Sequence, residues 1–357
     1  MPFKELEQWC VVNGQKSFRA KQLLNWIHQK QTLDFDGMSN LSSNFKKFLI
    51  DEASLVSPKV QNCFQSHDGS KKWLFNLGSG NLIETVLIPE RGRNTLCISS
   101  QVGCAVDCAF CSTGHQGFSR NLTSAEIIGQ LWKVQKETLQ RVSNVVMMGM
   151  GEPLLNFDNL IKALHLMLDD NAYGLSRRKV TVSTSGIIPM IDRLAEHCPV
   201  SLAVSLHAGN DLLRNRLVPI NKKYPVDKLL DACARYLEKS PRDFITFEIV
   251  MLRDVNDSVE NAKEILKKVI ARNINCKFNL IPFNSFGNSD YLSSTKSSIS
   301  KYSHFLQDAG YVVTSRKTRG NDIDAACGQL AGQVVDRTNI SARKGYFLKD
   351  VSFKGVI

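Results

Sequence analysis

The spacing of hydrophobic positions changes twice along the chain, and each change predicts a different kind of structure. Residues 1 to about 50 place apolar side chains at helical spacing, as in the run Phe18–Ile27. Residues 72–77 and 82–88 are short β-prone runs joined by the glycine-containing turn Gly78–Asn81, which predicts a hairpin. From about residue 94, short apolar runs alternate with longer amphipathic stretches, which is typical of strands alternating with helices.

The alternating part predicts an α/β fold. The expected strands lie at 95–98, 144–148, 179–183, 200–205, 245–250 and 277–281. One expected helix begins at Thr123, which has capping-box spacing to Glu126. Four others cover roughly 157–169, 226–239, 258–272 and 297–309. Such alternation favours a parallel sheet with right-handed crossovers. We therefore expect a partial (βα)6 barrel with a small N-terminal helical and β accessory domain, and an active site at the carboxyl ends of the strands.

These changes of pattern also suggest domain boundaries. We expect a helical N-terminal accessory domain over 1–54, a β-rich connector over 55–89, a core over 90–321 and a C-terminal segment over 322–357. The chain has 357 residues, of which 43% are hydrophobic and 22% charged, so a buried core is expected and disorder as the main state is excluded.

The formal net charge of +11 favours a polyanionic partner, with nucleic acid ahead of an anionic membrane surface. Basic residues gather at Arg177–Lys179, at Lys222–Lys223, at Lys267–Lys268, at Arg316–Lys317 with Arg319, and in the first segment at Lys16, Arg19, Lys21 and Lys30. Clusters of this kind neutralise phosphates, although each one alone is more often a solvated surface.

The N-terminal stretch lacks an apolar signal core, and no run approaches the ~18 apolar residues of a membrane span. We therefore expect a cytoplasmic protein without a membrane partner. In a reducing compartment its 10 cysteines indicate metal or redox chemistry rather than structural bridges.

Three cysteines form the most informative motif. Cys104, Cys108 and Cys111 follow the first expected strand with C-x3-C-x2-C spacing, within one loop. Three thiolates can hold three irons of a cubane cluster and leave the fourth iron open to an outside ligand. A zinc site, with His115 as fourth ligand, is the alternative.

This loop, placed after the first strand of a partial barrel, resembles that of the radical S-adenosylmethionine superfamily. The resemblance implies that the open iron binds the amino and carboxylate groups of S-adenosylmethionine and that an electron from the cluster yields a 5′-deoxyadenosyl radical. Within this superfamily, the runs Ser99–Cys104 and Arg316–Leu330 resemble the RlmN and Cfr group of RNA adenine methyltransferases, and RlmN most of all. This resemblance extends over most of the chain. Asn321 departs from that group, which often has Asp at this position.

The resemblance implies a 4Fe–4S cluster held by Cys104, Cys108 and Cys111, and two molecules of S-adenosylmethionine per turnover. The segment Met148–Pro153 ends the second expected strand and is similar to the part that receives the cofactor's amino group. The implied cofactor-binding residues are Gly151, Glu152, Ser183, Ser205, Leu206, His207 and Asn284.

The resemblance also implies a ping-pong reaction with a covalent intermediate. Cys327 takes a methyl group, which loses a hydrogen atom to the radical and adds to the adenine. Glu84 accepts the ring proton, and Cys97 attacks the sulfur of Cys327 to form a transient disulfide that releases the product. We interpret Cys10, Cys63, Cys198, Cys233 and Cys276 as structural.

The implied substrates are an adenine of 23S rRNA and the adenine 3′ of the anticodon in transfer RNA, methylated at carbon 2. Glu152-Pro153 and Arg316–Arg319 favour this branch. Methylation at carbon 8, of the Cfr type, is the alternative within the family. Two alternatives lie outside this family. One is a non-catalytic iron–sulfur or zinc module that binds RNA, and the other is a radical enzyme that acts on a small molecule. We expect a monomer that needs an unidentified electron donor.

Overall fold

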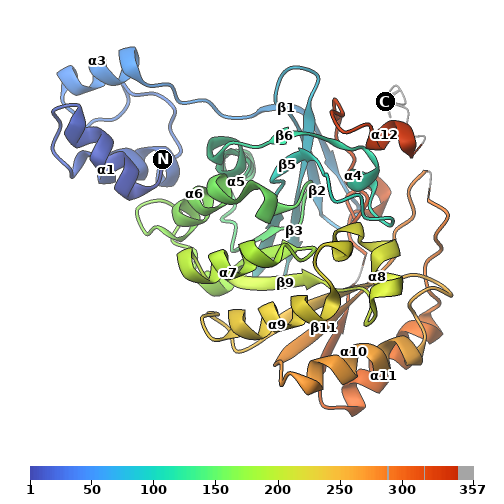
Figure 1. The fold of residues 1–357 in the computed structure, drawn as a ribbon. Helices are drawn as coiled ribbons and strands as arrows, with labels where there is room; N and C mark the ends of the chain where they lie inside the picture. Colours follow the sequence, from blue (N-terminus) through green and yellow to red (C-terminus); the bar gives the residue numbers. More distant parts are fainter. Residues whose placement is uncertain (288, 317, 345–357) are drawn as a thin grey trace.

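The protein is built on one long sheet, shown by a computed structural model that describes residues 1–287, 289–316 and 318–344. Lys317 and the part of the predicted C-terminal segment after residue 344 lie outside these residues. The strand order is β1-β2-β3-β4-β7-β8-β9-β10-β11-β12 (Figure 1). The bounds are β1 (Lys59–Gln65), β2 (Lys71–Asn76), β3 (Leu82–Glu90), β4 (Arg93–Cys97), β7 (Asn144–Met147), β8 (Val180–Thr184), β9 (Ser201–Ser205), β10 (Ile245–Met251), β11 (Cys276–Pro282) and β12 (Val312–Ser315).

The parallel half of this sheet is the predicted partial barrel. β4 and β7 to β11 contain the six expected strands, and each pairs in parallel with the next. The register places Cys97 beside Val146 and Val146 beside Thr181. The sheet does not close, because β1 and β12 are its two edges. The expected α/β class and open barrel are therefore confirmed.

Two strands of this sheet were not predicted. β12 extends it beyond β11 as a further parallel strand, but its four residues include three exposed ones, so no buried pattern reveals it. β1 pairs antiparallel with β2 and turns the predicted hairpin into a three-stranded meander. Its side chains alternate only between exposed and half-buried, which weakens the two-residue period.

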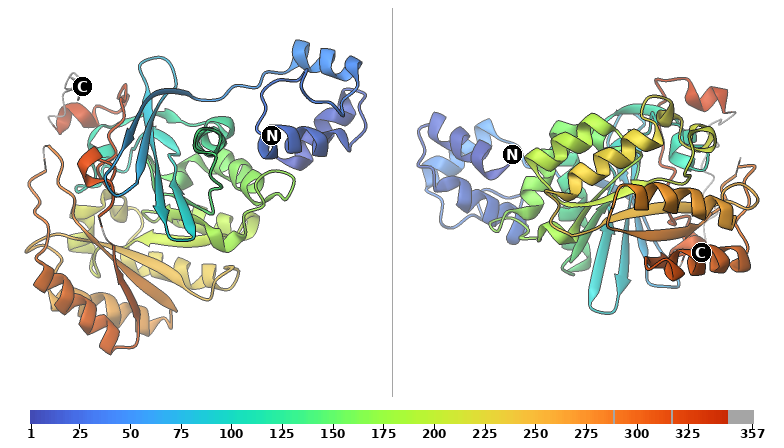
Figure 2. Two further views of the ribbon diagram at one scale, coloured as in Figure 1. Left: turned by 180° about the vertical axis from the view of Figure 1, so that it is seen from behind. Right: turned by 60° about the horizontal axis from the view of Figure 1, so that its bottom comes forward.

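Helices pack along the outside of the parallel strands (Figures 1 and 2). They are α5 (Ser124–Thr138), α6 (Phe157–Leu168), α7 (Ile188–His197), α9 (Val226–Leu237), α10 (Val259–Ala271) and α11 (Lys296–Asp308). The shorter helices α4 (Ser112–His115), α8 (Asp211–Leu217) and α12 (Ile340–Arg343) are not part of this layer. The predicted capping box at Thr123 and Glu126 is present. The helix α7 was missed, although Pro189 in its first turn is a typical residue at the start of a helix.

The N-terminal residues form a separate helical lobe, as expected (Figure 1). It contains α1 (Phe3–Val12), α2 (Arg19–Leu24), a π-helical turn (Asn25–Gln29) and α3 (Ser43–Glu52). Trp132 of α5 donates a hydrogen bond of 2.7 Å to the carbonyl of Ile27, and His28 Nδ1 lies 3.2 Å from the hydroxyl of Tyr173. These contacts fix the lobe on the core. No helix among the described residues has the length and apolar character to span a membrane.

The last described segment returns to the barrel mouth and β3 (Figure 2). Leu82 donates its backbone N–H to the carbonyl of Gln333, at 2.8 Å, and Arg337 donates to Phe118, also at 2.8 Å. Only a glycine allows this close approach at position 332, because a Cβ atom on Gly332 would lie 2.1 Å from the carbonyl oxygen of Leu82. The segment that carries Cys327 is therefore tied to the core on its C-terminal side.

Candidate functional site

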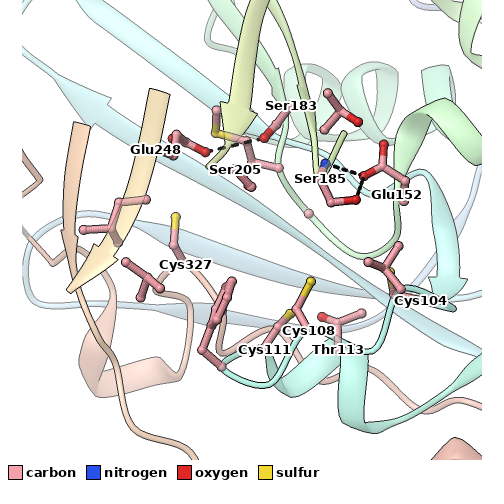
Figure 3. A pocket seen from close by; sticks show the side chains of 18 of the residues that line it. Cys104, Cys108, Cys111, Thr113, Glu152, Ser183, Ser185, Ser205, Glu248 and Cys327 are labelled. Carbon is pink, nitrogen blue, oxygen red and sulfur yellow. Dashed lines mark hydrogen bonds between the residues drawn. The ribbon is translucent and has the colours of Figure 1, made fainter. Parts of the chain in front are cut away.

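A cavity, called the first cavity below, lies at the carboxyl ends of the parallel strands (Figure 3). Cys104, Cys108 and Cys111 all line it, together with residues that end β7, β8 and β9. Figure 3 shows Glu152 near Cys104 and Cys327 toward the other end of the cavity. The predicted loop and the predicted strand ends are thus brought to one place.

The cysteine loop is a tight structure held by its own backbone. It leaves β5 (Gln101–Gly103), which pairs antiparallel with β6 (Phe118–Asn121). Cys104 donates to the carbonyl of Gly117 at 2.7 Å, and Gly103 has φ +74° with no room for a side chain, since a Cβ would lie 2.0 Å from the same carbonyl. A glycine is required there, because any larger residue would push the loop out of the cavity.

Burial raises the pKa of all three cysteine thiols, because a thiolate loses solvation there. In the part of the chain that the structure describes, no three His, Cys, Asp or Glu side chains already form a metal-ligand set. His115 does not line the first cavity, and its Nε2 lies 3.1 Å from the carbonyl oxygen of Ala109. The structure therefore gives no support to a zinc site with His115 as the fourth ligand.

The segment Met148–Pro153 brings backbone and a carboxylate against this loop. A Cβ at Gly149 would lie 2.6 Å from the carbonyl carbon of Ile98, and one at Gly151, with φ +95°, would lie 2.5 Å from Cβ of Gln101. Glu152 accepts hydrogen bonds of 2.7 Å from both the N–H and the hydroxyl of Ser185. Burial raises the pKa of Glu152, against these hydrogen bonds. A buried carboxylate so held suits an ammonium group of a ligand.

Three strand ends supply the opposite wall. Ser183 and Ser205 line the first cavity, and the hydroxyl of Ser183 lies 3.4 Å from the carboxylate of Glu248, as Figure 3 shows. His207 accepts the N–H of Val250 at Nδ1, at 3.0 Å, so its proton is on Nε2. This Nε2 is buried without a partner in the described structure. Burial lowers the pKa of His207 to about 3, so the ring offers a neutral donor to a ligand.

An arginine that the sequence did not reveal holds these strand ends together. Arg214 of α8 is fully buried and donates to the carbonyls of Ser185, Ser205 and Leu206, at 2.6, 2.9 and 3.0 Å. Burial lowers its pKa to about 10. Leu206 itself does not line the cavity and takes part through its backbone, whose N–H also bonds to Glu248. Nothing in the local pattern around Arg214 distinguishes it from a surface arginine.

A second cavity opens on the concave face of the sheet and contains both remaining cysteines of the predicted mechanism. Cys97 and Cys327 both line it. The two cavities have five lining residues in common, namely Met148, Glu248, Ile281, Arg316 and Cys327. Cys327 therefore stands in the wall between them. All ten cysteines are free; of those expected to be structural, Cys63 is exposed and the other four are buried.

Cys327 is held from several sides rather than lying in a free segment. Arg316 Nη1 lies 2.9 Å from its sulfur, and the side-chain amide of Asn284 donates to its carbonyl at 3.1 Å. Ser112, next to Cys111, donates to the carbonyl of Gly328 at 2.8 Å. Asn284 lines the second cavity and not the first, so it stands beside the Cys327 backbone.

Glu84 lies behind this segment and lines neither cavity. Its carboxylate is 3.0 Å from Lys72 Nζ and accepts the N–H of Ala331 at 3.0 Å. Burial raises its pKa, and Lys72 opposes that shift. Leu330, which precedes Ala331 in the chain, does line the second cavity.

The residues of the first cavity fit the cofactors that the resemblance implies. Three soft sulfur ligands on one loop suit an iron–sulfur cluster with one open iron. The Glu152 carboxylate and the unpartnered Nε2–H of His207 are complementary to the ammonium and to an acceptor of S-adenosylmethionine. When bound, these groups supply a radical that abstracts hydrogen atoms.

Comparisons with known proteins agree with this geometry. Residues 98–269 match the model of the radical SAM superfamily, and residues 1–55 match that of the ribosomal RNA large subunit methyltransferase N-terminal domain. A crystal structure of a radical SAM methyltransferase from Sphaerobacter thermophilus is similar, with 38% identity and a TM-score of 0.85, and the match covers 92% of this chain and 97% of that one.

Two more distant structures also match. One is a domain of pyruvate-formate lyase-activating enzyme from Bacteroides vulgatus, with 19% identity, a TM-score of 0.39 and coverage of 49% of this chain and 99% of that one. The other is HydG, a maturase of the [FeFe]-hydrogenase, with 14% identity, a TM-score of 0.46 and coverage of 67% and 56%. The identity to the Sphaerobacter enzyme over almost its whole length, together with the two family models, is decisive: the chain belongs to the RlmN/Cfr-like family of radical S-adenosylmethionine methyltransferases.

Proposed function

We propose that this enzyme methylates carbon 2 of a specific adenine in 23S rRNA, and of the adenine 3′ of the anticodon in transfer RNA, through a methylated Cys327. The observation that carries the proposal is the position of Cys327. Its sulfur lies in the wall shared by the first cavity, which suits the cofactors, and the second cavity, which also contains Cys97. A methyl group carried on this sulfur has access to both.

The reaction begins with Cys327 as a nucleophile. Its thiolate attacks the methyl carbon of S-adenosylmethionine, so that an S–CH3 bond forms and the sulfonium bond breaks. Arg316, 2.9 Å away, holds the sulfur and favours its anionic form. Burial alone raises the pKa of Cys327, and Arg316 opposes that shift.

Release of the product requires a second thiolate. Cys97 attacks the sulfur of Cys327, an S–S bond forms, and the bond from sulfur to the base-bearing carbon breaks. The electron pair of the broken bond stays on the released base, whose methylene carbon takes up a proton and becomes the methyl group. An external thiol then reduces the disulfide with two electrons. Cys97 ends β4 on the concave face, at the level of Val146 in the next strand, and lines the cavity that Cys327 also lines.

Glu84 is the proposed acceptor of the ring proton. Its burial raises its pKa, which makes the carboxylate a stronger base than a solvated one. Its hydrogen bond to Ala331 connects it to the segment of Cys327. Lys72 Nζ lies 3.0 Å from one oxygen of this carboxylate, and Leu330, which precedes Ala331 in the chain, lines the second cavity.

The test is a methylation assay. The anaerobically reconstituted protein is incubated with S-adenosylmethionine, a reductant and unmodified 23S rRNA or transfer RNA, and the nucleosides are identified by mass spectrometry. We expect 2-methyladenosine with the wild type and none with Cys327→Ala. Cys97→Ala should leave RNA attached to Cys327, because the release step is missing.

The other outcomes assign the alternatives. A carbon-8 product keeps the reaction and moves the protein to the other branch of the family. Cleavage of S-adenosylmethionine without any methylated adenine would mean that RNA is not the substrate. A reconstituted protein that binds RNA but does not cleave S-adenosylmethionine would contradict catalysis altogether.

A further inference from the structure

The second cavity has a cationic end that the reaction above does not use. Arg178, Arg242 and Lys277 line this cavity. Arg178 and Arg242 stand shortly before β8 and β10, and Lys277 is the second residue of β11. These positions are at the amino ends of the strands, whereas the first cavity lies at their carboxyl ends. We call these three residues the basic triad.

The basic triad is held in place by neutral groups. Arg178 donates to the carbonyl of Pro241 at 2.7 Å, and Arg242 donates to the carbonyl of Arg178, also at 2.7 Å. Arg242 and Lys277 lie 5.3 and 5.2 Å from the ring centre of Phe244. In the described parts of the chain, no carboxylate comes within 4.0 Å of any of the three cations.

The basic triad gathers three positive charges at one end of the second cavity, where they repel one another. Burial lowers the pKa of Lys277 and Arg242 lowers it further, whereas Glu248 in the same cavity raises it and Arg93 lowers it. By contrast Lys268, from another basic cluster, forms a salt bridge of 2.7 Å with Asp227 on the helical layer. Cations that gather at the end of a cavity without a salt bridge are complementary to an anion.

The rest of the second cavity suits nucleosides. Its floor carries uncharged polar side chains, namely Thr95, Asn144, Thr181, Thr246 and Asn279. Hydroxyls and amides of this kind bond to base edges and ribose. The cavity continues to Cys97 and Cys327. Thr181 is level with Cys97 through Val146, and Arg178 lies in the 3-10 turn Arg177–Lys179 that precedes β8.

We propose that the second cavity receives a single-stranded stretch of RNA from the amino ends of the strands, with its phosphates on the basic triad and its target base at Cys327. S-adenosylmethionine then occupies the first cavity, and the two substrates meet from opposite ends at the shared wall. This inference rests on the proposed function, since it takes RNA as the substrate. An acidic protein donor of electrons is the rival occupant, but Arg242 and Lys277 are half-buried inside the cavity, where a folded protein surface makes poor contact.

The test compares Arg178→Gln and Lys277→Gln with Lys263→Gln, which removes the same charge from an exposed position on α10. The probe is a short single-stranded RNA with one adenine among uridines, and its Kd is measured by fluorescence anisotropy across a series of KCl concentrations. Each triad variant should weaken binding by roughly three- to tenfold and reduce the salt slope by about one, whereas the control should match the wild type. Unchanged thermal unfolding would show that the variants fold.

A second readout separates this inference from the proposed function. Methylation of Cys327 by S-adenosylmethionine without RNA should be the same in all variants, because the first cavity is untouched. Equal affinity and equal salt slope in the triad variants and the control would overturn the inference, even if the enzyme methylates adenine. Unchanged RNA binding with slower reduction by an acidic protein donor would also overturn it and assign the basic triad to that protein. Weaker RNA binding in an enzyme that makes no methyladenosine would uphold the RNA site while the proposed reaction fails.

Discussion

The guanidinium of Arg316 lies 2.9 Å from the sulfur of Cys327. Burial raises the pKa of Cys327 and raises that of Cys97 to about 12, and in both cases Arg316 opposes the shift. One cation thus acts on both cysteines of the proposed reaction. Once Cys327 carries a methyl group its sulfur is neutral, so that the guanidinium then favours the thiolate of Cys97, the next nucleophile.

Replacement of Arg316 by Met should slow methylation of Cys327 by roughly ten- to a hundredfold near neutral pH, because each unit of pKa removes about 90% of the thiolate. Since the thiolate fraction rises with pH, the variant should recover at higher pH. The measurement is the mass of the Cys327 peptide against time after addition of S-adenosylmethionine. Arg316→Lys keeps the charge and should be affected less. Equal rates in Met and wild-type enzymes at every pH would contradict a role for this contact.

Replacement of Glu152 by Gln should separate cofactor binding from stability. Burial disfavours the charged carboxylate, so the neutral amide should leave the melting temperature unchanged or higher. Affinity for S-adenosylmethionine should fall by about tenfold or more, because a charge-assisted hydrogen bond is lost. Calorimetric titration of the reconstituted enzyme measures the affinity, and differential scanning calorimetry of the same preparation measures the melting temperature. A lower melting temperature with unchanged affinity would assign Glu152 a purely structural role.

The close approach of Gly149 to Ile98 leads to a third prediction. A Cβ at Gly149 would meet the carbonyl carbon at 2.6 Å, so Gly149→Ala should destabilise the fold by about 1–3 kcal/mol through overpacking. Because the same turn carries Glu152, the affinity for S-adenosylmethionine should fall as well. Gly287→Ala is the matched control, since a Cβ there meets nothing within 4 Å. Similar unfolding curves for the two variants would show that the strand end adjusts at little cost.

The sequence predicted the parallel sheet well because its strands are buried and leave clear apolar runs. β10, for example, is buried at six of its seven positions. The pattern failed at the edges, where β1 has no buried residue and three of the four residues of β12 are exposed. It also failed at α7, where only three of the ten residues are buried. Burial on both faces, rather than strand propensity, made the difference.

The site shows the same division. The cysteine loop and the glycines before Glu152 were recognisable because their chemistry and their tight backbone permit few other residues. Arg214 and Glu248 could not be recognised from the sequence, because their importance depends on contacts between distant elements. Arg316 was grouped with the RNA-binding basic residues, whereas in the fold it bonds to Cys327. Long-range pairings of this kind have no local signal.

A final prediction concerns the junction between the N-terminal lobe and the core. His28 is buried beside Tyr173, and burial lowers its pKa to about 4 from the ordinary 6.5. The folded state therefore binds fewer protons than the unfolded state between these values, and stability is full above pH 6.5 and falls as the pH decreases toward 4. Between pH 7.5 and 5 the loss should be about 2 kcal/mol. Thermal unfolding of the wild type and of His28→Phe at both pH values measures it, and the variant should lose less stability by that amount. If both proteins lose the same amount, His28 takes up its proton over the same pH range in the folded and unfolded states, and its burial beside Tyr173 does not lower its pKa.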